Sequence, residues 1–391
     1  MASEPASTAE PLSGSQRVLD RLSGSLWSVA LGSLAVVVAG GLVQVSFGAY
    51  SMTLVEAWGA VFDPNVLFNT EAWRAFLLGT ELPEMNQRSL IVWNIRLPRV
   101  LVAALVGANL AVSGAIFQAV TRNELASPFI LGVSSGAGLM ILLVLVVFSG
   151  VTLVIPYVFG TLVLGISSLL PVIAALGGIG AFLIVYVIAW KNGTSPVRLV
   201  LAGVIVGTVF SSLQTGLFFF ADDIGVVQSA IAWTTGSLTG TDWEQVRMAL
   251  PWTVVALGLS LASARQLNVL LLGENTASSL GMNVEKVRFA LSGVAVLAAA
   301  ASIAVAGIVG FVGLIVPHMV RNVVGSDYRR LVVGCVFAGP ALMVAADVGA
   351  RLGLSILLGS DGQMPVGIVT GLLGGPYFLY LMRKQERMGE I

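Results

Sequence analysis

The chain has very few of the residues that most often bind metals, form disulfides or solvate a protein surface. Its 391 residues include one cysteine, one histidine and three lysines, and only 10% are charged. The lone cysteine, Cys335, excludes a disulfide within the chain and a site built from several thiolates. The lone histidine, His318, excludes a multi-histidine metal site. We therefore expect this chain to bind no metal ion and no cofactor of its own.

The shortage of charge also bounds the class of protein. Soluble domains carry about 25% charged residues, so a chain with 10% has too few to solvate a soluble fold. Hydrophobic residues make up 57% of the chain, the mean hydropathy is +0.94, and there are 45 glycines. Many small residues in an apolar chain are typical of closely packed membrane helices. The composition predicts an all-α polytopic membrane protein.

No catalytic constellation emerges from the sequence. None of the lysines, Lys191, Lys286 and Lys384, lies in the G-x-x-x-x-G-K-[ST] pattern that cradles nucleotide phosphates. If ATP drives this protein, another subunit must hold the ATP with its magnesium and hydrolyse it. We assign no catalytic residue and predict that the chain is not itself an enzyme.

Ten apolar runs predict helices that cross a bilayer, for which about 20 mostly apolar residues are needed. They lie at 26–48, 97–119, 128–149, 169–190, 199–220, 248–265, 288–307, 310–324, 331–352 and 364–382. Residues 1–25 are rich in Ser, Ala and Pro, and predict a disordered tail before an uncleaved first helix. Residues 49–95 contain five acidic residues, which predict a hydrophilic loop.

The distribution of charge fixes the orientation that we predict. Residues 151–190 are apolar for forty positions and have room for one span or two. With one span, 14 of the 20 basic residues fall on the side of the N-terminus, which the positive-inside rule places in the cytoplasm. Both termini are then cytoplasmic, and ten acidic residues fall in external loops: Glu56, Asp63, Glu71, Glu81, Glu84, Asp222, Asp223, Asp242, Glu244 and Asp361.

Two stretches resemble each other weakly and run in opposite directions through the predicted membrane. Residues 110–132 and 303–325 share an Ala-Val-small-Gly opening and a later basic-Asn pair, Arg122-Asn123 and Arg321-Asn322. Opposed repeats of this kind are frequent in transporters, with the substrate path at their interface. The alternative is chance similarity between two helices rich in Gly and Ala.

The fifth span carries a polar stripe. Its members recur at helical spacing, i, i+3, i+4 and i+7: Thr208, Ser211, Ser212 and Thr215. Such a stripe can line an aqueous path through the membrane. The alternative is hydrogen bonding between helices, a common role of Ser and Thr in membranes.

Three arginines lie at helix ends that we predict to face outward, against the general bias. They are Arg96, Arg99 and Arg351. Because two cations near a helix N-terminus face an unfavourable helix dipole, we expect an acidic partner, either an external protein or the 49–95 loop. Contact with lipid headgroups is the alternative. Asp347 precedes Arg351 by four residues and predicts a helical ion pair, with a proton relay as the less favoured interpretation.

Three long motifs, in order, resemble the FecCD-type permease family, the membrane subunits of type II ABC importers for iron-siderophores, haem and vitamin B12. They are "RLPRVLVAALVGANLAVSGAIFQAVTRNELASPFILGVSSGAG" (96–138), "LNVLLLGENTASSLGMNVEKVR" (267–288) and "GFVGLIVPHMVRNVVGSDYRRLVVGCVFAGPALMVAADVGARL" (310–352). The resemblance covers residues 30–385. It implies a ten-helix permease domain over 26–385, followed by a cytoplasmic tail, 386–391. It also implies a second permease copy, identical or paralogous, two cytoplasmic ATPase subunits and an external substrate-binding protein.

The resemblance also implies site residues. Residues 266–287, a polar stretch between two apolar runs that we call the polar island, match the cytoplasmic segment that the ATPase contacts in this family. The residues that the resemblance assigns to this contact are Gly273, Glu274, Thr276, Ala277, Ser278, Leu280, Gly281 and Asn283. In this segment Glu274–Leu280 predicts a short helix that Gly281 stops, and Asn283 predicts the N-cap of a second one, with Glu285 near its N-terminus.

The family's docking arginines match Arg96, Arg99 and Arg351. Its cytoplasmic gate matches Asn123 and Leu125, and the turn 192–198 is expected to supply the other side of the gate. We therefore predict an ATP-driven importer in the cell membrane that moves a metal chelate by alternating access and has no nucleic-acid partner. The stretch "NELASPFILGVSSGAG" (123–138) favours an iron-siderophore, with vitamin B12 and haem as alternatives. The rivals from other classes are an ion-coupled secondary transporter and a membrane-embedded enzyme.

Overall fold

Long apolar helices make up most of the chain. The computed structural model describes residues 26–46, 50, 52–148, 152–157, 160–191, 193–221, 224–358 and 363–388. Within these residues, seven helices are long and apolar enough to cross a membrane, and three more are apolar but shorter. Each of the ten predicted spans coincides with one of them: α2 (Leu26–Ser46), α7 (Leu97–Thr121), α8 (Val133–Val147), α9 (Ile166–Ala189), α10 (Pro196–Phe218), α12 (Trp243–Ala262), α15 (Val284–Ala306), α16 (Val312–Val324), α17 (Tyr328–Leu358) and α18 (Val366–Met388).

The segment 49–95, predicted to be a hydrophilic loop rather than a span, contains short helices in its described part. These are α3 (Leu54–Val61), α4 (Pro64–Leu67), α5 (Thr70–Leu78), α6 (Gln87–Ile91) and the π-helical turn η1 (Val92–Arg96) that leads into α7. Two of the five acidic residues that suggested a loop take part in helix caps: Glu56 forms a capping box with Thr53, and Asp63 caps α4. Asn69 caps α5. Phe76 stacks on Trp93 and on Trp243 of α12, so the short helices share the core of the bundle.

The apolar stretch between α8 and α10 holds a hairpin and one helix. β1 (Thr152–Tyr157) pairs antiparallel with β2 (Gly160–Gly165), in the register Thr152↔Gly165 to Tyr157↔Gly160. The Val, Ile and Leu residues of both strands suit a pleated backbone. One span, α9, follows, as the charge argument predicts. Two further helices lie in predicted connectors: α11 (Ile224–Thr235) and α13 (Ala264–Leu271).

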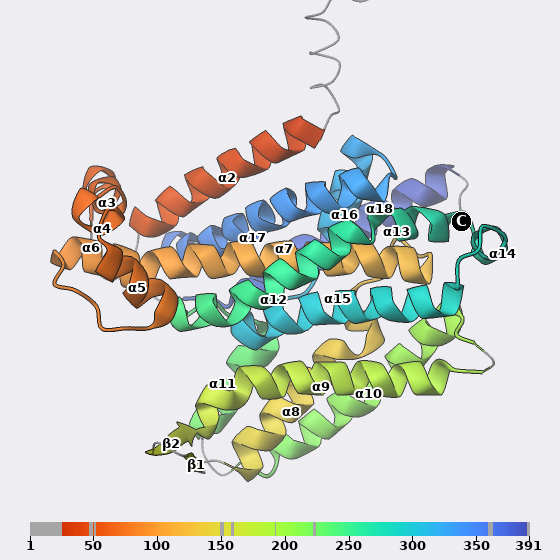
Figure 1. Ribbon diagram of the computed structural model, residues 1–391, viewed down its shortest axis with the longest axis horizontal. Coiled ribbons are helices and arrows are strands. Elements are labelled where there is room, and N and C mark those ends of the chain that lie inside the picture. The colour runs from red at the N-terminus through yellow and green to blue at the C-terminus, as the bar shows by residue number, and fades with distance from the viewer. Residues whose placement is uncertain are drawn as a thin grey trace, which may run out of the picture.

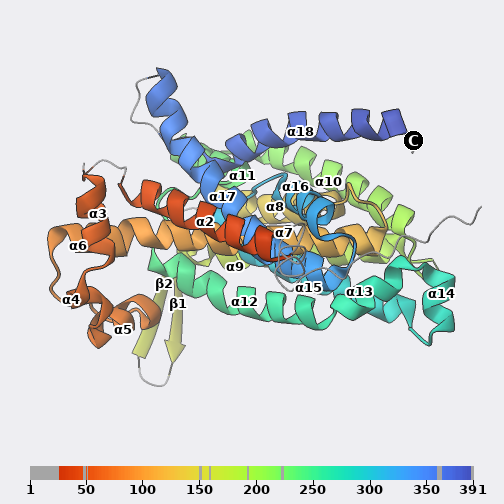
Figure 2. The ribbon, with the colours of Figure 1, turned by 90° about the horizontal axis from the view of Figure 1, so that it is seen from above.

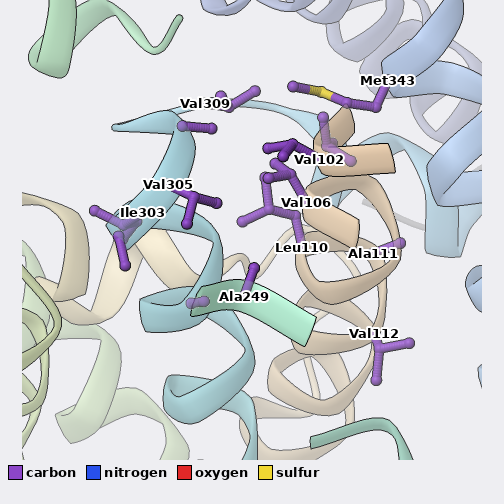
Figure 3. Close-up of a cluster of buried hydrophobic side chains, with 14 of the residues drawn as sticks. Val102, Val106, Leu110, Ala111, Val112, Ala249, Ile303, Val305, Val309 and Met343 are labelled. Carbon is purple, nitrogen blue, oxygen red and sulfur yellow. The ribbon is translucent and has the colours of Figure 1, made fainter. Parts of the chain in front are cut away.

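Helix α7 is the central element of the bundle, and α15 and α17 run along it (Figure 1; Figure 2). In Figure 3, Val106 and Leu110 of α7 lie between Val305 of α15 and Met343 of α17. Glycines allow the closest crossings. A Cβ at Gly114 would lie 1.8 Å from the carbonyl oxygen of Gly313 in α16, so the two backbones meet directly. Helix association through small residues explains much of the high glycine content.

The two ends of the bundle carry different small elements (Figure 1). At one end, which we call the α14 end, lies α14 (Glu274–Ser279), and α18 also ends at this end of the bundle (Figure 2). At the other, the α5 end, lie α3 to α6 and the β-hairpin. Helix α18 runs to Met388 and so takes in the start of the predicted tail, 386–391. The predicted tail 1–25 and the acidic residues Asp222, Asp223 and Asp361 lie outside the described residues.

The proposed inverted repeat is not matched at its basic-Asn pairs. Arg122 follows the end of α7 in a left-handed backbone conformation with φ of 50°, whereas Arg321 lies within α16. The two pairs therefore do not occupy equivalent positions. Both segments do contain a helix that ends and a break before the next helix, so the repeat stays a prediction.

Candidate functional site

The polar island forms the small exposed structure that its sequence predicts. Helix α14 spans Glu274–Ser279, Leu280 is its C-cap, and Gly281 follows with φ of 84°, a left-handed conformation that glycine adopts without strain. The Asn283 side chain caps α15 by accepting a hydrogen bond from the Lys286 amide at 3.0 Å. Among the residues that the resemblance assigns to ATPase contact, Thr276, Ser278, Leu280, Gly281 and Asn283 are exposed, Gly273 and Glu274 are half-buried, and Ala277 is buried.

A buried arginine ties α14 to the rest of the molecule. Arg288 of α15 has a side chain only 2% exposed, and its Nη2 atom lies 2.5 Å from Oε1 of Glu274. Its Nη1 atom donates to the Thr194 carbonyl oxygen at 2.6 Å, in the turn between α9 and α10. Glu285 accepts from the Thr194 amide at 2.9 Å and from the Tyr186 hydroxyl at 2.6 Å. Sequence reasoning gave Arg288 only a topological role, although its i+3 spacing from Glu285 was a usable signal.

The polar stripe of α10 borders a cavity of about 530 Å³. Thr208 and Ser211 line this cavity, whereas Ser212 and Thr215 lie outside its lining on the exposed surface of the chain. The hydroxyls of Thr208, Ser212 and Thr215 each donate to the carbonyl four residues earlier. They are therefore satisfied within the helix and retain lone pairs that can accept hydrogen bonds.

Further polar groups of this cavity were missed by sequence reasoning. Gln214 lies on the same helix face and donates to the Ser135 carbonyl oxygen at 2.8 Å. Ser134, at the start of α8, is 5% exposed, and its hydroxyl has no hydrogen-bond partner among the described residues. Thr234 of α11 completes the polar lining. The i+3 spacing of Ser211 and Gln214 could have added Gln214 to the predicted stripe.

A second cavity, of about 670 Å³, brings the two predicted gate turns together. Asn123 and Leu125 lie on one side, and Pro196 and Val197, from the turn 192–198 and the start of α10, lie on the other. The Asn123 side chain accepts from the Leu125 amide at 2.9 Å and so fixes the shape of its own turn. Val204 lines both cavities, so they follow each other along α10.

Glu124 joins the first gate turn to α16. Its carboxylate lies 3.0 Å from Nη1 of Arg321 and 3.8 Å from Nδ1 of His318. Arg321 also donates to the Gln118 side chain at 2.9 Å. No local sequence pattern relates His318 to Glu124, because the two residues are far apart in the chain.

Two of the three predicted docking arginines are buried. Arg96 and Arg99 are each 4% exposed. Arg96 donates to the carbonyl oxygen of Val45, in the last turn of α2, and to that of Tyr50, beyond the end of α2. Arg351 is half-buried and donates to the Gln44 carbonyl oxygen at 3.2 Å. An unfavourable helix dipole can be offset by internal acceptors as well as by an external protein, and internal ones are present here.

The predicted ion pair between Asp347 and Arg351 is wrong, because Asp347 binds a different arginine. Both carboxylate oxygens of Asp347 accept from Arg99, at 2.7 and 2.8 Å, and Gln44 donates to the same carboxylate. Asp347 is 0% exposed. A bidentate arginine offers better geometry for a buried carboxylate than an i+4 contact along one helix, so the partner comes from α7.

Within the described parts of the chain, no group of three or more His, Cys, Asp or Glu residues could hold a metal ion. Cys335 is fully buried, and burial makes such a thiol inert.

The architecture, with apolar helices around two consecutive cavities and an exposed polar helix at one end, is that of a membrane transport permease. The chain belongs to the FecCD transport family, whose model matches residues 23–384, and is an ABC transporter permease.

Named relatives cover most of the chain. It is 39% identical to the iron(3+)-hydroxamate import system permease protein FhuG of Bacillus subtilis, over 75% of this chain and 84% of that protein. It is 38% identical to the cobalamin import system permease protein BtuC of Halobacterium salinarum, over 92% and 96% respectively. The hemin transport system permease protein HmuU of Yersinia pestis is 35% identical, over 88% and 92%. Three relatives with three different named cargoes are thus almost equally similar.

The fold is also similar to a solved structure. A transporter assigned to the metal-chelate ABC type, described in an inward-facing conformation, matches with a TM-score of 0.73 and 26% identity. The match covers 91% of this chain and 99% of the other. The arrangement of helices is therefore that of a known permease along nearly its whole length.

Proposed function

We propose that this chain is the permease subunit of an ATP-driven importer that moves a metal chelate across the cell membrane by alternating access. The observation that carries this proposal is the pair of consecutive cavities along α10, with the two predicted gate turns around one of them. Membership of the FecCD family and the named relatives support it. The α14 end then faces the cytoplasm, and both termini lie on that side.

The two cavities correspond to two parts of one path. Asn123 and Leu125 form the cytoplasmic gate with Pro196 and Val197, and the hydroxyls of Thr208 and Ser211 line the path above it. Ser212 and Thr215 lie on an exposed face of α10, where their hydroxyl oxygens can accept hydrogen bonds from a neighbouring surface. A second permease copy facing this stripe completes the path between the two subunits.

The two ends of the bundle bind different protein partners. The exposed side chains of α14 receive the ATPase subunits, which hold the ATP and magnesium, and the α5 end receives the external binding protein. Because Arg96 and Arg99 are buried, Arg351 is the most accessible of the three predicted docking arginines. Arg96 and Arg99 reach a docked protein only if their internal contacts open.

An iron-siderophore is the cargo that we favour, since the FhuG relative is named for iron(3+)-hydroxamate. Cobalamin and haem are the alternatives, named for relatives of nearly equal identity. The path offers hydroxyl and amide groups, which suit a chelate that arrives with its metal already bound. Substrate choice then rests largely with the binding protein, and identifying the ligand that the cognate binding protein holds decides among the three.

Vesicle uptake tests the class of transporter. The chain is reconstituted with its cognate ATPase and binding protein, with ATP enclosed on the side of the α14 end or omitted, and ferric hydroxamate, cobalamin and haem are offered in turn. We expect one of them to accumulate only with ATP, and an uncoupler to leave the rate unchanged. Uptake that needs no ATP and collapses with the uncoupler would instead identify an ion-coupled secondary transporter.

A further inference from the structure

Arg288 has an unusual position for a charged residue in this chain. It lies in the second turn of α15, and its side chain is 2% exposed. Its two terminal nitrogens point to different segments: Nη2 to Glu274 at the start of α14, and Nη1 to the Thr194 carbonyl oxygen before α10. A planar guanidinium can hold two such acceptors in fixed relative positions, which a lysine could not.

Thr194 is held from α15 at every polar atom. Its carbonyl oxygen accepts from Arg288 at 2.6 Å, and its amide donates to Glu285 Oε2 at 2.9 Å. Its hydroxyl lies 2.7 Å from Glu285 Oε1. Two side chains one helical turn apart on α15 therefore fix one residue of the α9–α10 turn, and Tyr186 of α9 braces Glu285 from the other side at 2.6 Å.

The turn leads directly into the helix that lines both cavities. Only Ser195 separates Thr194 from α10, and Ser195 makes no side-chain capping bond. Pro196 and Val197, the first residues of α10, already line the gate cavity. With so short a connection, a displacement of Thr194 must move the start of α10.

The two ends of this chain of contacts differ in exposure. The Glu274 side chain is 43% exposed and can be reached by a partner, whereas Arg288 is buried. Because the Glu274 carboxylate is exposed to solvent, its ion pair with Arg288 contributes little to stability, so stability alone does not account for a charge that is buried at Arg288. We propose that Arg288 is a positioning residue that transmits displacement of α14 to Thr194, and through it to α10 and the gate. This inference rests on the proposed function, since it names the link between the predicted ATPase contact and the predicted gate.

Distance measurements on the whole complex test the link. Spin labels at Leu125 and Val197, on opposite sides of the gate cavity, report on the gate, and labels at Ser278 and Val197 report on α14 relative to α10. Both pairs are measured without nucleotide and with ATP and vanadate. The variant is Arg288→Gln, and Arg330→Gln, an exposed arginine outside the described network, is the matched control.

In the wild type and in Arg330→Gln we expect ATP to shift the Leu125–Val197 distance while the Ser278–Val197 distance stays narrow. In Arg288→Gln, ATP hydrolysis continues, the Ser278–Val197 distribution broadens, and the fraction of molecules with a shifted gate falls about tenfold, within the usual range for coupling between two sites. Thr194→Val removes only the contacts of the hydroxyl, with Glu285 and with Arg288. It gives the same change to a smaller degree and serves if Arg288→Gln does not fold.

The outcomes are distinguishable. A full gate shift in both Arg288→Gln and Thr194→Val would overturn the inference and leave the proposed function standing. A wild-type complex whose gate distance does not respond to ATP would overturn the proposed function, and the inference with it.

Discussion

Each end of the bundle holds a buried arginine network, but the two networks join different kinds of element. At the α5 end, Arg99 binds Asp347 with both partners at most 5% exposed, and the pair connects the long helices α7 and α17, with Gln44 of α2 beside them. At the α14 end, Arg288 binds a short surface helix and a turn, and its partner Glu274 is 43% exposed. The first network fixes helices against each other, and the second connects an accessible surface to a gate. We call the first network, Arg99 with Asp347, the clamp, and the second, Arg288 with Glu274 and Thr194, the link. The burial of an arginine alone therefore does not distinguish these two roles.

The largest effect is expected where the clamp is broken. Arg99→Gln leaves the carboxylate of Asp347 buried without its cation, and removing one partner of a buried pair typically costs about 3 to 5 kcal/mol. We expect a large fall in the thermal unfolding midpoint of the detergent-purified chain. Arg88→Gln, which breaks the exposed pair with Glu56, is the control and should change stability by less than about 1 kcal/mol. Equal midpoints for the two variants would remove the basis for calling the α5 end a clamp.

A smaller effect is expected at the crossing of α7 and α16, between the two ends. Gly114→Ala places a Cβ 1.8 Å from the Gly313 carbonyl oxygen, so the helices must separate. Overpacking of this kind costs about 1 to 3 kcal/mol. Gly293→Ala, in α15 with no atom within 4 Å of its added Cβ, is the matched control. The thermal unfolding midpoints of both variants measure whether the close backbone contact between α7 and α16 contributes to stability. An unchanged midpoint for Gly114→Ala would show that it does not.

At the α14 end, the effect should appear in transport rather than in stability. Glu274→Lys reverses the charge that faces Arg288, and we expect vesicle uptake to fall about tenfold, in the range of site-to-site coupling. Insertion into the membrane and binding of the external protein should stay normal. Wild-type uptake by this variant would show that the Glu274 contact does not carry the coupling.

The smallest effect concerns pH at the support of the α14 end. Asp327 accepts from Asn268 of α13 at 2.7 Å and from the Arg329 amide at 3.0 Å, and these hydrogen bonds, the first above all, lower the pKa of its carboxyl. Its contribution to stability is therefore present above the unfolded pKa of about 4 and is lost as pH falls through the lower, folded value. Unfolding midpoints of wild type and Asp327→Asn should differ at pH 7 and 5, and the difference should shrink as the pH falls below about 4. A difference that does not change over this range would argue against this carboxylate.

The sequence predicts the structure of each end well where the interacting residues are close in the chain, and poorly where they are far apart. Hydropathy located all ten apolar helices, and local capping rules predicted α14, the turn at Gly281 and the cap at Asn283. Local rules failed where the partner is remote. They paired Asp347 with Arg351, whereas Arg99 lies 248 positions away, and they could not join Arg288 to Thr194, 94 positions away. They also took the helix caps of 49–95 for loop residues, because caps and loops use the same polar side chains.

One side-by-side measurement tests the difference between the ends most directly. Arg99→Gln and Arg288→Gln carry the same chemical change, and for each we would measure the unfolding midpoint and the amount of cargo moved per ATP hydrolysed. The account predicts that Arg99→Gln lowers the midpoint much more than the ratio, and that Arg288→Gln lowers the ratio much more than the midpoint. Two variants that lose the same property to the same degree would contradict it.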